Sequence, residues 1–228
     1  MSPYTEIDRS RTPARLRLPE RYNASLDFID RHLDEGRGGK VAFRDDQGDH
    51  TYGQLAERVN QAGHALMSQG VGPGDRVMMI MTDTAAFPAV FFGAIRIGAV
   101  PVPVNTLLTT KDYGYMLGDS GARALVVSDV FWETVAPVLN DHEDLRAVIV
   151  NGTTAGSAQS LGDMMAALPT TLPALMATPD APCFWLYTSG STGQPKGAVH
   201  AQKDLIHTAE LYGVGVLGIR EDDVVFSA

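Results

Sequence analysis

The fold is decided by residues 76–104, which read RVMMIMTDTAAFPAVFFGAIRIGAVPVPV. The run Arg76–Met81 is short and apolar, which is typical of a buried strand. A second apolar run follows at Ala99–Val104, where Pro101 and Pro103 lack a backbone N–H and so favour the edge or the end of a sheet. Two such strands separated by a helix-length segment predict a βαβ unit.

The segment between the two runs predicts a helix, with apolar side chains gathered at residues 90–97 and an end at Gly98. Asp83 or Thr84 can cap its first turn, because each offers a side-chain oxygen to the free backbone N–H groups. Pro88 is tolerated near that turn, where no helical hydrogen bond is lost.

The same alternation extends outward in both directions. Upstream, residues 53–69 carry apolar side chains at helical spacing. Downstream, the patterns predict a helix at 109–118, a strand at 122–128, a helix at 130–140 and a strand at 145–150. Helices that alternate with short buried strands indicate an α/β fold. We therefore expect a twisted, mostly parallel sheet with helices on both faces.

Composition excludes several classes of protein. The 228-residue chain carries a net charge of −9, which argues against a general nucleic-acid binder, because phosphate neutralisation needs clustered Lys and Arg. The longest nearly apolar stretch, Ala85–Ile95, is shorter than the roughly 20 residues of a membrane span. The one cysteine, Cys183, can form neither an internal disulfide nor a cysteine-based zinc site. We expect a cytoplasmic protein without a metal site of its own.

Residues 1–39 are interpreted as an N-terminal extension followed by a first helix. The first 21 residues contain five arginines, at positions 9, 11, 15, 17 and 21. Three acidic residues lie among them, at positions 6, 8 and 20. A basic arm for a membrane or a targeting receptor is one interpretation, but interleaved acids and prolines break any amphipathic pattern. A loosely ordered extension is the preferred prediction.

The stretch with the clearest chemistry is residues 187–197, YTSGSTGQPKG. It follows an apolar run and offers the four hydroxyls of its Thr and Ser residues, a series of backbone N–H groups and the charge of Lys196. Such concave arrays bind phosphate oxygens. A flexible Gly/Ser linker or an ordinary surface turn is the alternative. A standard P-loop is excluded, because Lys196 follows Pro195 and Gly197 stands where a magnesium-binding hydroxyl is required.

This stretch resembles the signature of the adenylate-forming superfamily, which contains acyl- and aryl-CoA ligases, nonribosomal adenylation domains and beetle luciferases. Residues 51–55, TYGQL, resemble the first core motif of that family, and residues 92–105, FGAIRIGAVPVPVN, resemble the second. The motifs occur in the order of the family, so the resemblance covers residues 40–228. Residues 83–105 are most similar to benzoate-CoA ligases.

The resemblance implies an ATP-dependent ligase. An aromatic carboxylate would attack the α-phosphorus of Mg²⁺-ATP and expel pyrophosphate, and coenzyme A would then displace AMP. The residues implied to bind the β- and γ-phosphates are Thr188, Ser189, Gly190, Ser191, Thr192, Gly193 and Lys196, with Lys196 as the catalytic residue. Phe226, Ser227 and Ala228 are implied to line the carboxylate pocket. A fatty-acyl or amino-acid adenylating enzyme and a noncatalytic nucleotide-binding module remain alternatives.

Residues 40–228 would then be part of an N-terminal adenylation domain, and residues 223–228 would be a strand that is cut short. The family's magnesium-binding Glu, ribose-binding Asp, carboxylate-orienting Lys and small C-terminal domain lie further along its chains. We therefore expect the present chain alone to be inactive.

Other polar groups receive ordinary roles. His200 and His207 are seven apart on a predicted helix, whereas a zinc pair prefers a spacing of four, so polar or capping roles are expected. Asp45, Asp46 and Asp49 surround Gly48 and predict a solvated hairpin turn.

Overall fold

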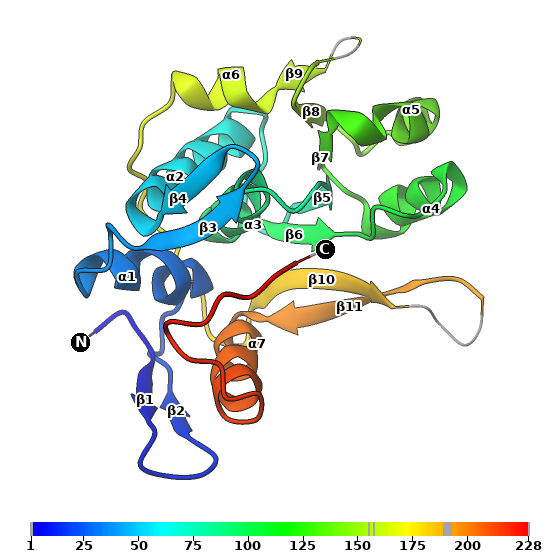
Figure 1. The fold of residues 1–228 in the computed structure, drawn as a ribbon. Helices are drawn as coiled ribbons and strands as arrows, with labels where there is room; N and C mark the ends of the chain where they lie inside the picture. The colour runs from blue at the N-terminus through cyan, green and yellow to red at the C-terminus, as the bar shows by residue number, and fades with distance from the viewer. Residues whose placement is uncertain (1, 155, 157, 189–192, 228) are drawn as a thin grey trace.

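A five-stranded parallel sheet forms the centre of the computed structural model, which describes residues 2–154, 156, 158–188 and 193–227 (Figure 1). Its strand order is β6-β5-β7-β8-β9, and each neighbouring pair is parallel. The strands are β5 (Arg76–Ile80), β6 (Val100–Pro103), β7 (Ala124–Ser128), β8 (Ala147–Asn151) and β9 (Gln159–Ser160). The predicted mostly parallel sheet is confirmed.

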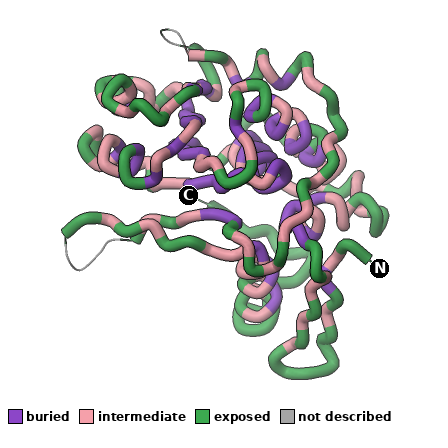
Figure 2. Tube along the Cα trace, turned by 180° about the vertical axis from the view of Figure 1, so that it is seen from behind, coloured by how far each residue is buried: buried purple, intermediate pink, exposed green. Residues whose placement is uncertain are grey.

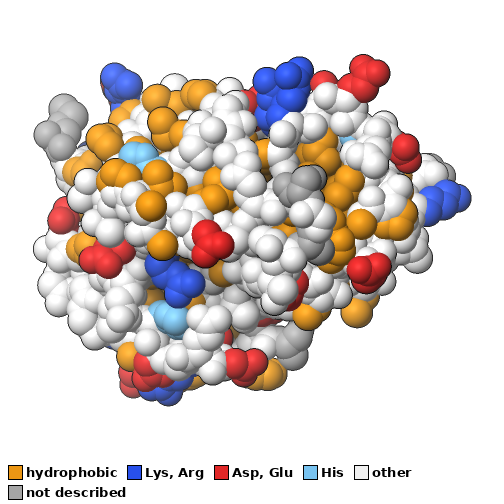
Figure 3. All heavy atoms as spheres, turned by 90° about the horizontal axis from the view of Figure 1, so that it is seen from above, with side chains coloured by type: hydrophobic (Ala, Val, Ile, Leu, Met, Phe, Trp, Pro, Cys, Tyr) orange, Lys and Arg blue, Asp and Glu red, His pale blue; other side chains and the backbone are white. Residues whose placement is uncertain are grey.

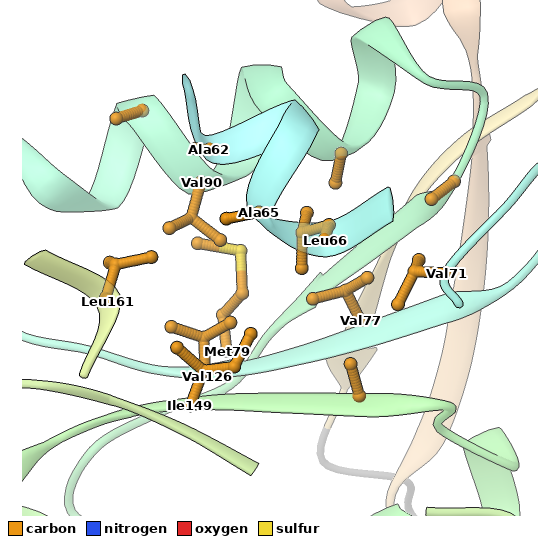
Figure 4. Packing of buried hydrophobic residues seen from close by; sticks show 14 of the residues in the cluster. Ala62, Ala65, Leu66, Val71, Val77, Met79, Val90, Val126, Ile149 and Leu161 are labelled. Carbon is orange, nitrogen blue, oxygen red and sulfur yellow. The ribbon is translucent and has the colours of Figure 1, made fainter. Parts of the chain in front are cut away.

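Helices cover both faces of this sheet, as the sequence predicted. One face packs against α2 (Tyr52–Ser68), α3 (Ala86–Arg96) and α6 (Leu161–Ala166), and the other against α4 (Thr110–Ser120) and α5 (Trp132–Val135). Side chains of β5 alternate between the two layers: Val77 and Met79 join the first (Figure 4), and Met78 and Ile80 join the second. Because both faces of the sheet are covered, positions 77–80 of this strand are all apolar rather than alternately apolar and polar.

Helices α2 and α3 approach each other through two glycines. A Cβ atom on Gly93 would lie 2.9 Å from both the Gly63 nitrogen and the Val59 oxygen. Only glycine fits, because the obstructing atoms belong to backbone. The segment that the sequence predicted at 53–69 is thus confirmed as a helix and positioned by this crossing.

The start of α3 differs from the prediction. Neither Asp83 nor Thr84 caps it, since the N-cap position is Ala85 and makes no side-chain cap. Instead Asp45 Oδ2 accepts a hydrogen bond from the Ala85 N–H at 2.9 Å. Asp45 ends β3 (Val41–Asp45), which pairs antiparallel with β4 (Gly48–Thr51). The predicted hairpin is confirmed, but the Asp45 side chain is only 6% exposed and is not solvated.

Strand β6 lies at the edge of the sheet, as its prolines predicted. The segment predicted as one helix at 130–140 consists of α5 between two 3₁₀ turns, Asp129–Phe131 and Ala136–Asp141. Pro137 lies at the start of the second turn. Because proline cannot donate an intrahelical hydrogen bond, the α-helix does not continue through it.

The N-terminal segment is ordered rather than loose. Strands β1 (Glu6–Asp8) and β2 (Arg15–Arg17) form an antiparallel hairpin. An ion pair of 2.7 Å joins Arg9 Nη2 to Glu210 Oε1, in the π-helical turn Thr208–Val214 that follows α7 (Gln202–His207). Arg9, in the segment that was predicted to be loosely ordered, therefore pairs with a residue 201 positions further along the chain.

Residues 22–24 join distant parts of the core. The Asn23 side-chain amide donates to the Ile95 oxygen at 2.9 Å and to the Leu175 oxygen at 2.8 Å. The Ala24 N–H donates to Gln202 Oε1 at 2.8 Å. The buried positions gather in the sheet, its helices and this segment (Figure 2). The segment is therefore an integral part of the core.

A buried carboxylate holds the following turn. Asp27 accepts hydrogen bonds from the Thr5 N–H and hydroxyl and from the Tyr22 hydroxyl, and Arg31 pairs with it at 3.2 Å. Asp27 lies in the π-helical turn Leu26–Asp30, and Arg31 begins α1 (Arg31–Asp34). This network satisfies a charge that would otherwise be costly to bury.

The strand predicted at 223–228 is not found: residues 223–227 are irregular, and Ala228 lies outside the described residues.

Within the described ranges, no helix is both long and apolar enough to cross a bilayer. On the face seen in Figure 3, Lys and Arg side chains stand apart from one another among acidic and apolar groups.

Candidate functional site

A β-hairpin carries the stretch that the sequence singled out. Strands β10 (Pro182–Thr188) and β11 (Lys196–Ala201) pair antiparallel, with Thr188 opposite Lys196 at the end that carries the connecting loop. The hairpin forms a separate sheet, and β10 lies beside β6 at the edge of the central one (Figure 1). Residues 187–197 thus comprise the ends of two paired strands and the connection between them.

The described residues at this end present polar groups and one cation. Thr188 Oγ1 donates to the Lys196 oxygen at 3.5 Å. Gly193 has a φ of +106°, which is a conformation that side-chain-bearing residues rarely adopt. Lys196 is exposed, and the lysine ion pairs of the described residues engage Lys40 and Lys203 but not Lys196. Its ammonium group is therefore available to an anion.

The predicted phosphate-binding residues Ser189, Gly190, Ser191 and Thr192 lie outside the described residues. Their neighbours Thr188, Gly193 and Lys196 are brought to one end of the hairpin, as an anion-binding loop requires. Antiparallel pairing places Thr188 directly opposite Lys196, so the polar groups of these two residues can act on one ligand.

Helix α4 holds both ends of the loop. The Tyr187 hydroxyl donates to Asp119 Oδ2 at 2.7 Å, and the Tyr115 hydroxyl donates to the Pro195 oxygen at 3.1 Å. Burial and the adjacent Asp119 carboxylate raise the pKa of Tyr187, so its hydroxyl remains a donor. Sequence reasoning missed Tyr115 and Asp119. Their i, i+4 spacing on one helix face was the only available signal.

Two histidines lie elsewhere than predicted. His200 is in β11 and His207 is in α7, so they do not share a helix. The His200 ring stacks on Phe184 with centroids 4.5 Å apart, and its Nδ1 lies 3.8 Å from Asp204 Oδ2. Cys183 is buried, which raises the pKa of its thiol and keeps it unreactive. Among the described residues, no group of three His, Cys, Asp or Glu side chains could hold a metal.

The three residues predicted to line the carboxylate pocket, Phe226, Ser227 and Ala228, differ in where the structure places them. A hollow of about 410 Å³ opens at the carboxyl ends of β5 and β6, with Asp83, Phe87, Asn105 and Phe131 among its lining residues. Ser227 Oγ donates to Asp83 Oδ2 at 2.6 Å, which places Ser227 beside this hollow. Phe226 is 87% exposed, and Ala228 lies outside the described residues.

Known proteins are similar to this chain in sequence and in fold. Benzoate--CoA ligase of Thauera aromatica is 50% identical over 97% of the chain, and 4-hydroxybenzoate--CoA/benzoate--CoA ligase of Rhodopseudomonas palustris is 40% identical over 91%. The crystal structure of anthranilate CoA ligase AuaEII with anthranoyl-AMP matches 90% of the chain, with a TM-score of 0.86 and 36% identity. A benzoate CoA ligase from Burkholderia xenovorans matches 89%, with a TM-score of 0.78 and 39% identity.

The chain spans 42% and 38% of the two ligase sequences, and 40% and 39% of the two solved chains. The model of the family described as AMP-binding enzyme matches residues 30–228. The resemblance noted in the three sequence motifs is thereby confirmed, and the chain belongs to the family of AMP-binding enzymes.

Proposed function

We propose that the protein containing this chain is an ATP-dependent CoA ligase for an aromatic carboxylate of the benzoate class. The observation that carries the proposal is the β10–β11 hairpin, which presents Lys196 beside a loop of small and hydroxyl residues. The identity of 50% with a benzoate--CoA ligase and the likeness to a ligase solved with anthranoyl-AMP support an aromatic acid.

In the first half-reaction, a carboxylate oxygen forms a bond to the α-phosphorus of ATP, and the bond from that phosphorus to pyrophosphate breaks. Negative charge then builds on the leaving pyrophosphate. Lys196 would meet this charge together with the hydroxyl of Thr188 and the groups of residues 189–193. Mg²⁺ would arrive as its complex with ATP. In the second half-reaction, the coenzyme A thiolate attacks the acyl carbon and AMP leaves.

Further assignments belong to the same proposal. Residues 40–228 would contribute to the adenylation domain, and residues 1–39 would precede it. Phe226, Ser227 and Ala228 would contribute to the carboxylate pocket, and the enzyme would work in the cytoplasm. Fixed donors at the leaving group would act without reorganisation during the reaction, which is the main advantage of a preformed hairpin over a flexible linker.

Carboxylate-dependent exchange of pyrophosphate into ATP tests the function in the full-length protein that contains this chain. Benzoate and 2-aminobenzoate should support exchange and yield CoA thioesters that mass spectrometry identifies. If only an aliphatic acid supported pyrophosphate exchange, the protein would be a fatty-acyl adenylating enzyme. If only an amino acid did, it would be an amino-acid adenylating enzyme. ATP binding without exchange for any acid would indicate a noncatalytic nucleotide-binding module.

A further inference from the structure

The two ends of the phosphate loop are tied to one helix. Tyr187, the residue before Thr188, donates its hydroxyl to Asp119 Oδ2 at 2.7 Å, and a second contact of 3.4 Å reaches the Met116 oxygen. Pro195, the residue before Lys196, accepts a hydrogen bond from Tyr115 at 3.1 Å. Both tyrosine rings are half-buried and pack against the apolar cluster beneath α4.

The helix is a firm support for these contacts. A capping box closes the first turn of α4, in which Thr109 and Asp112 exchange side-chain to backbone hydrogen bonds. Tyr113, Met116 and Leu117 are at most 3% exposed and pack the opposite side of α4 into the core. Tyr115 and Asp119 are four residues apart, so they lie on one face of a helix that cannot rotate without disturbing this packing.

We infer that Tyr115 and Asp119 are positioning residues for the phosphate loop, because they hold its two ends at a set separation from α4 and so direct Lys196 toward the leaving pyrophosphate. This inference rests on the proposed function. Neither residue touches the nucleotide in this role. Their effect is to restrict the hairpin before ATP binds, which lowers the ordering cost of binding and aligns the donors.

Removal of the two hydroxyls tests the inference in the full-length protein. The double variant Tyr115→Phe/Tyr187→Phe keeps both rings in place and deletes only the hydrogen bonds. We expect pyrophosphate exchange to fall about 5- to 20-fold in kcat/KM for ATP, as for the loss of two ordinary hydrogen bonds. Thiolation of preformed acyl-adenylate should change less than about 2-fold, because that step involves no pyrophosphate. Asp119→Ala should give a smaller loss of the same kind.

Tyr113→Phe is the matched control. Tyr113 is on the same helix and donates its hydroxyl to the Asn105 oxygen at 3.1 Å, away from the hairpin. The inference would be wrong if Tyr113→Phe lowered pyrophosphate exchange as much as the double variant does. It would also be wrong if the double variant slowed both half-reactions equally, because the two tyrosines would then have only a structural role.

Hydrogen exchange separates this inference from the proposed function. Backbone amides of residues 182–188 and 196–201 should exchange faster in the double variant than in the wild-type protein or in Tyr113→Phe. That result would support the restriction of the hairpin even if no carboxylate supported pyrophosphate exchange, in which case only the proposed function would fail. Unchanged amide exchange would overturn the inference whatever the activity.

Discussion

Arg96 and Asp30 form a two-pronged ion pair, with Arg96 Nη1 at 2.6 Å from Asp30 Oδ2 and Nη2 at 2.9 Å from Oδ1. The Arg96 side chain is 7% exposed, and its Nε donates to the Leu172 oxygen at 2.6 Å. One guanidinium group therefore joins the end of α3, the N-terminal segment and the connection before β10. Arg-carboxylate pairs of this geometry are stronger than single contacts.

Asp30→Ala should destabilise the fold by about 3 kcal/mol. The substitution removes two of the three hydrogen bonds of the buried Arg96 guanidinium and leaves only the one to the Leu172 oxygen. Urea denaturation measures the change. Asp49→Ala is the control: Asp49 pairs with Arg44 at 2.8 Å, but both side chains are more than half exposed, so its loss should cost about 0.5 kcal/mol. Equal losses would contradict the structural role given to Arg96.

Asp45→Ala should lower stability in a pH-dependent manner. Burial alone would raise the pKa of Asp45, but hydrogen bonds from the Ala85 N–H, His50 and the Gln47 N–H outweigh it and lower the pKa to about 2. The unfolded carboxyl titrates near about 3.9. The ionised form thus contributes about 2.6 kcal/mol above pH 4, and this contribution is lost as the pH falls towards 2.

The difference in unfolding free energy between wild-type protein and Asp45→Ala should therefore be constant above about pH 4 and shrink below it. Asp46→Ala, at the exposed neighbouring position, should show only a small difference in unfolding free energy. If the difference in unfolding free energy between the wild-type protein and Asp45→Ala stayed the same from pH 2 to 7, the ionised Asp45 carboxylate would not be what stabilises the start of α3.

Lys196→Ala should slow adenylate formation by about 10- to 150-fold, the effect of losing one charge-assisted hydrogen bond of about 1.5–3 kcal/mol in the transition state. Thiolation of preformed adenylate should be nearly unchanged. Pyrophosphate exchange and single-turnover thiolation measure the two steps in the full-length protein. Lys203→Ala removes a lysine that instead pairs with Asp180, and it should affect neither. Equal losses in both steps for Lys196→Ala would indicate a folding defect.

Gly193→Ala should weaken ATP binding with little effect on overall stability. A Cβ atom there would meet nothing within 4 Å, so the only cost is the backbone strain of a φ of +106°, about 1–2 kcal/mol. The loop can relieve that strain by changing its shape, which should raise the KM for ATP several-fold. Gly218→Ala imposes similar strain at a φ of +70° in open space, away from the hairpin. A KM that rose in both variants would contradict the local explanation.

Sequence reasoning succeeded where the chemistry is local. Pro101 and Pro103 lack donors, so the edge position of β6 could be predicted without knowledge of its neighbours. The cap of α3 could not, because Asp45 lies forty residues before Ala85 and reaches it only through a hairpin. The local pattern predicted a helix at His200, whereas the residue lies in β11. That strand forms by pairing with β10, and the pattern around His200 alone does not identify this partner.

The same distinction applies to the candidate site. The loop residues at 187–197 form one contiguous pattern, so their residue types and their resemblance to a known motif are enough to predict phosphate binding. Tyr115 and Asp119 belong to the same site in space but lie about seventy residues earlier, on a helix whose spacing indicates only a shared face. The residues that hold a site in place are harder to predict than those that form it, because their role depends on tertiary contacts.

The hydrogen bond between the Ala24 N–H and Gln202 has a consequence for synthesis of the chain. The two residues are 178 positions apart, so at about 5–20 residues per second the ribosome produces Gln202 roughly 10–40 s after Ala24. Tyr22, fully buried in the finished fold, pairs with Ala177 and must also wait. Residues 22–24 therefore stay without these partners until Ala177 and Gln202 have been made, and a chaperone would have to protect them during that interval.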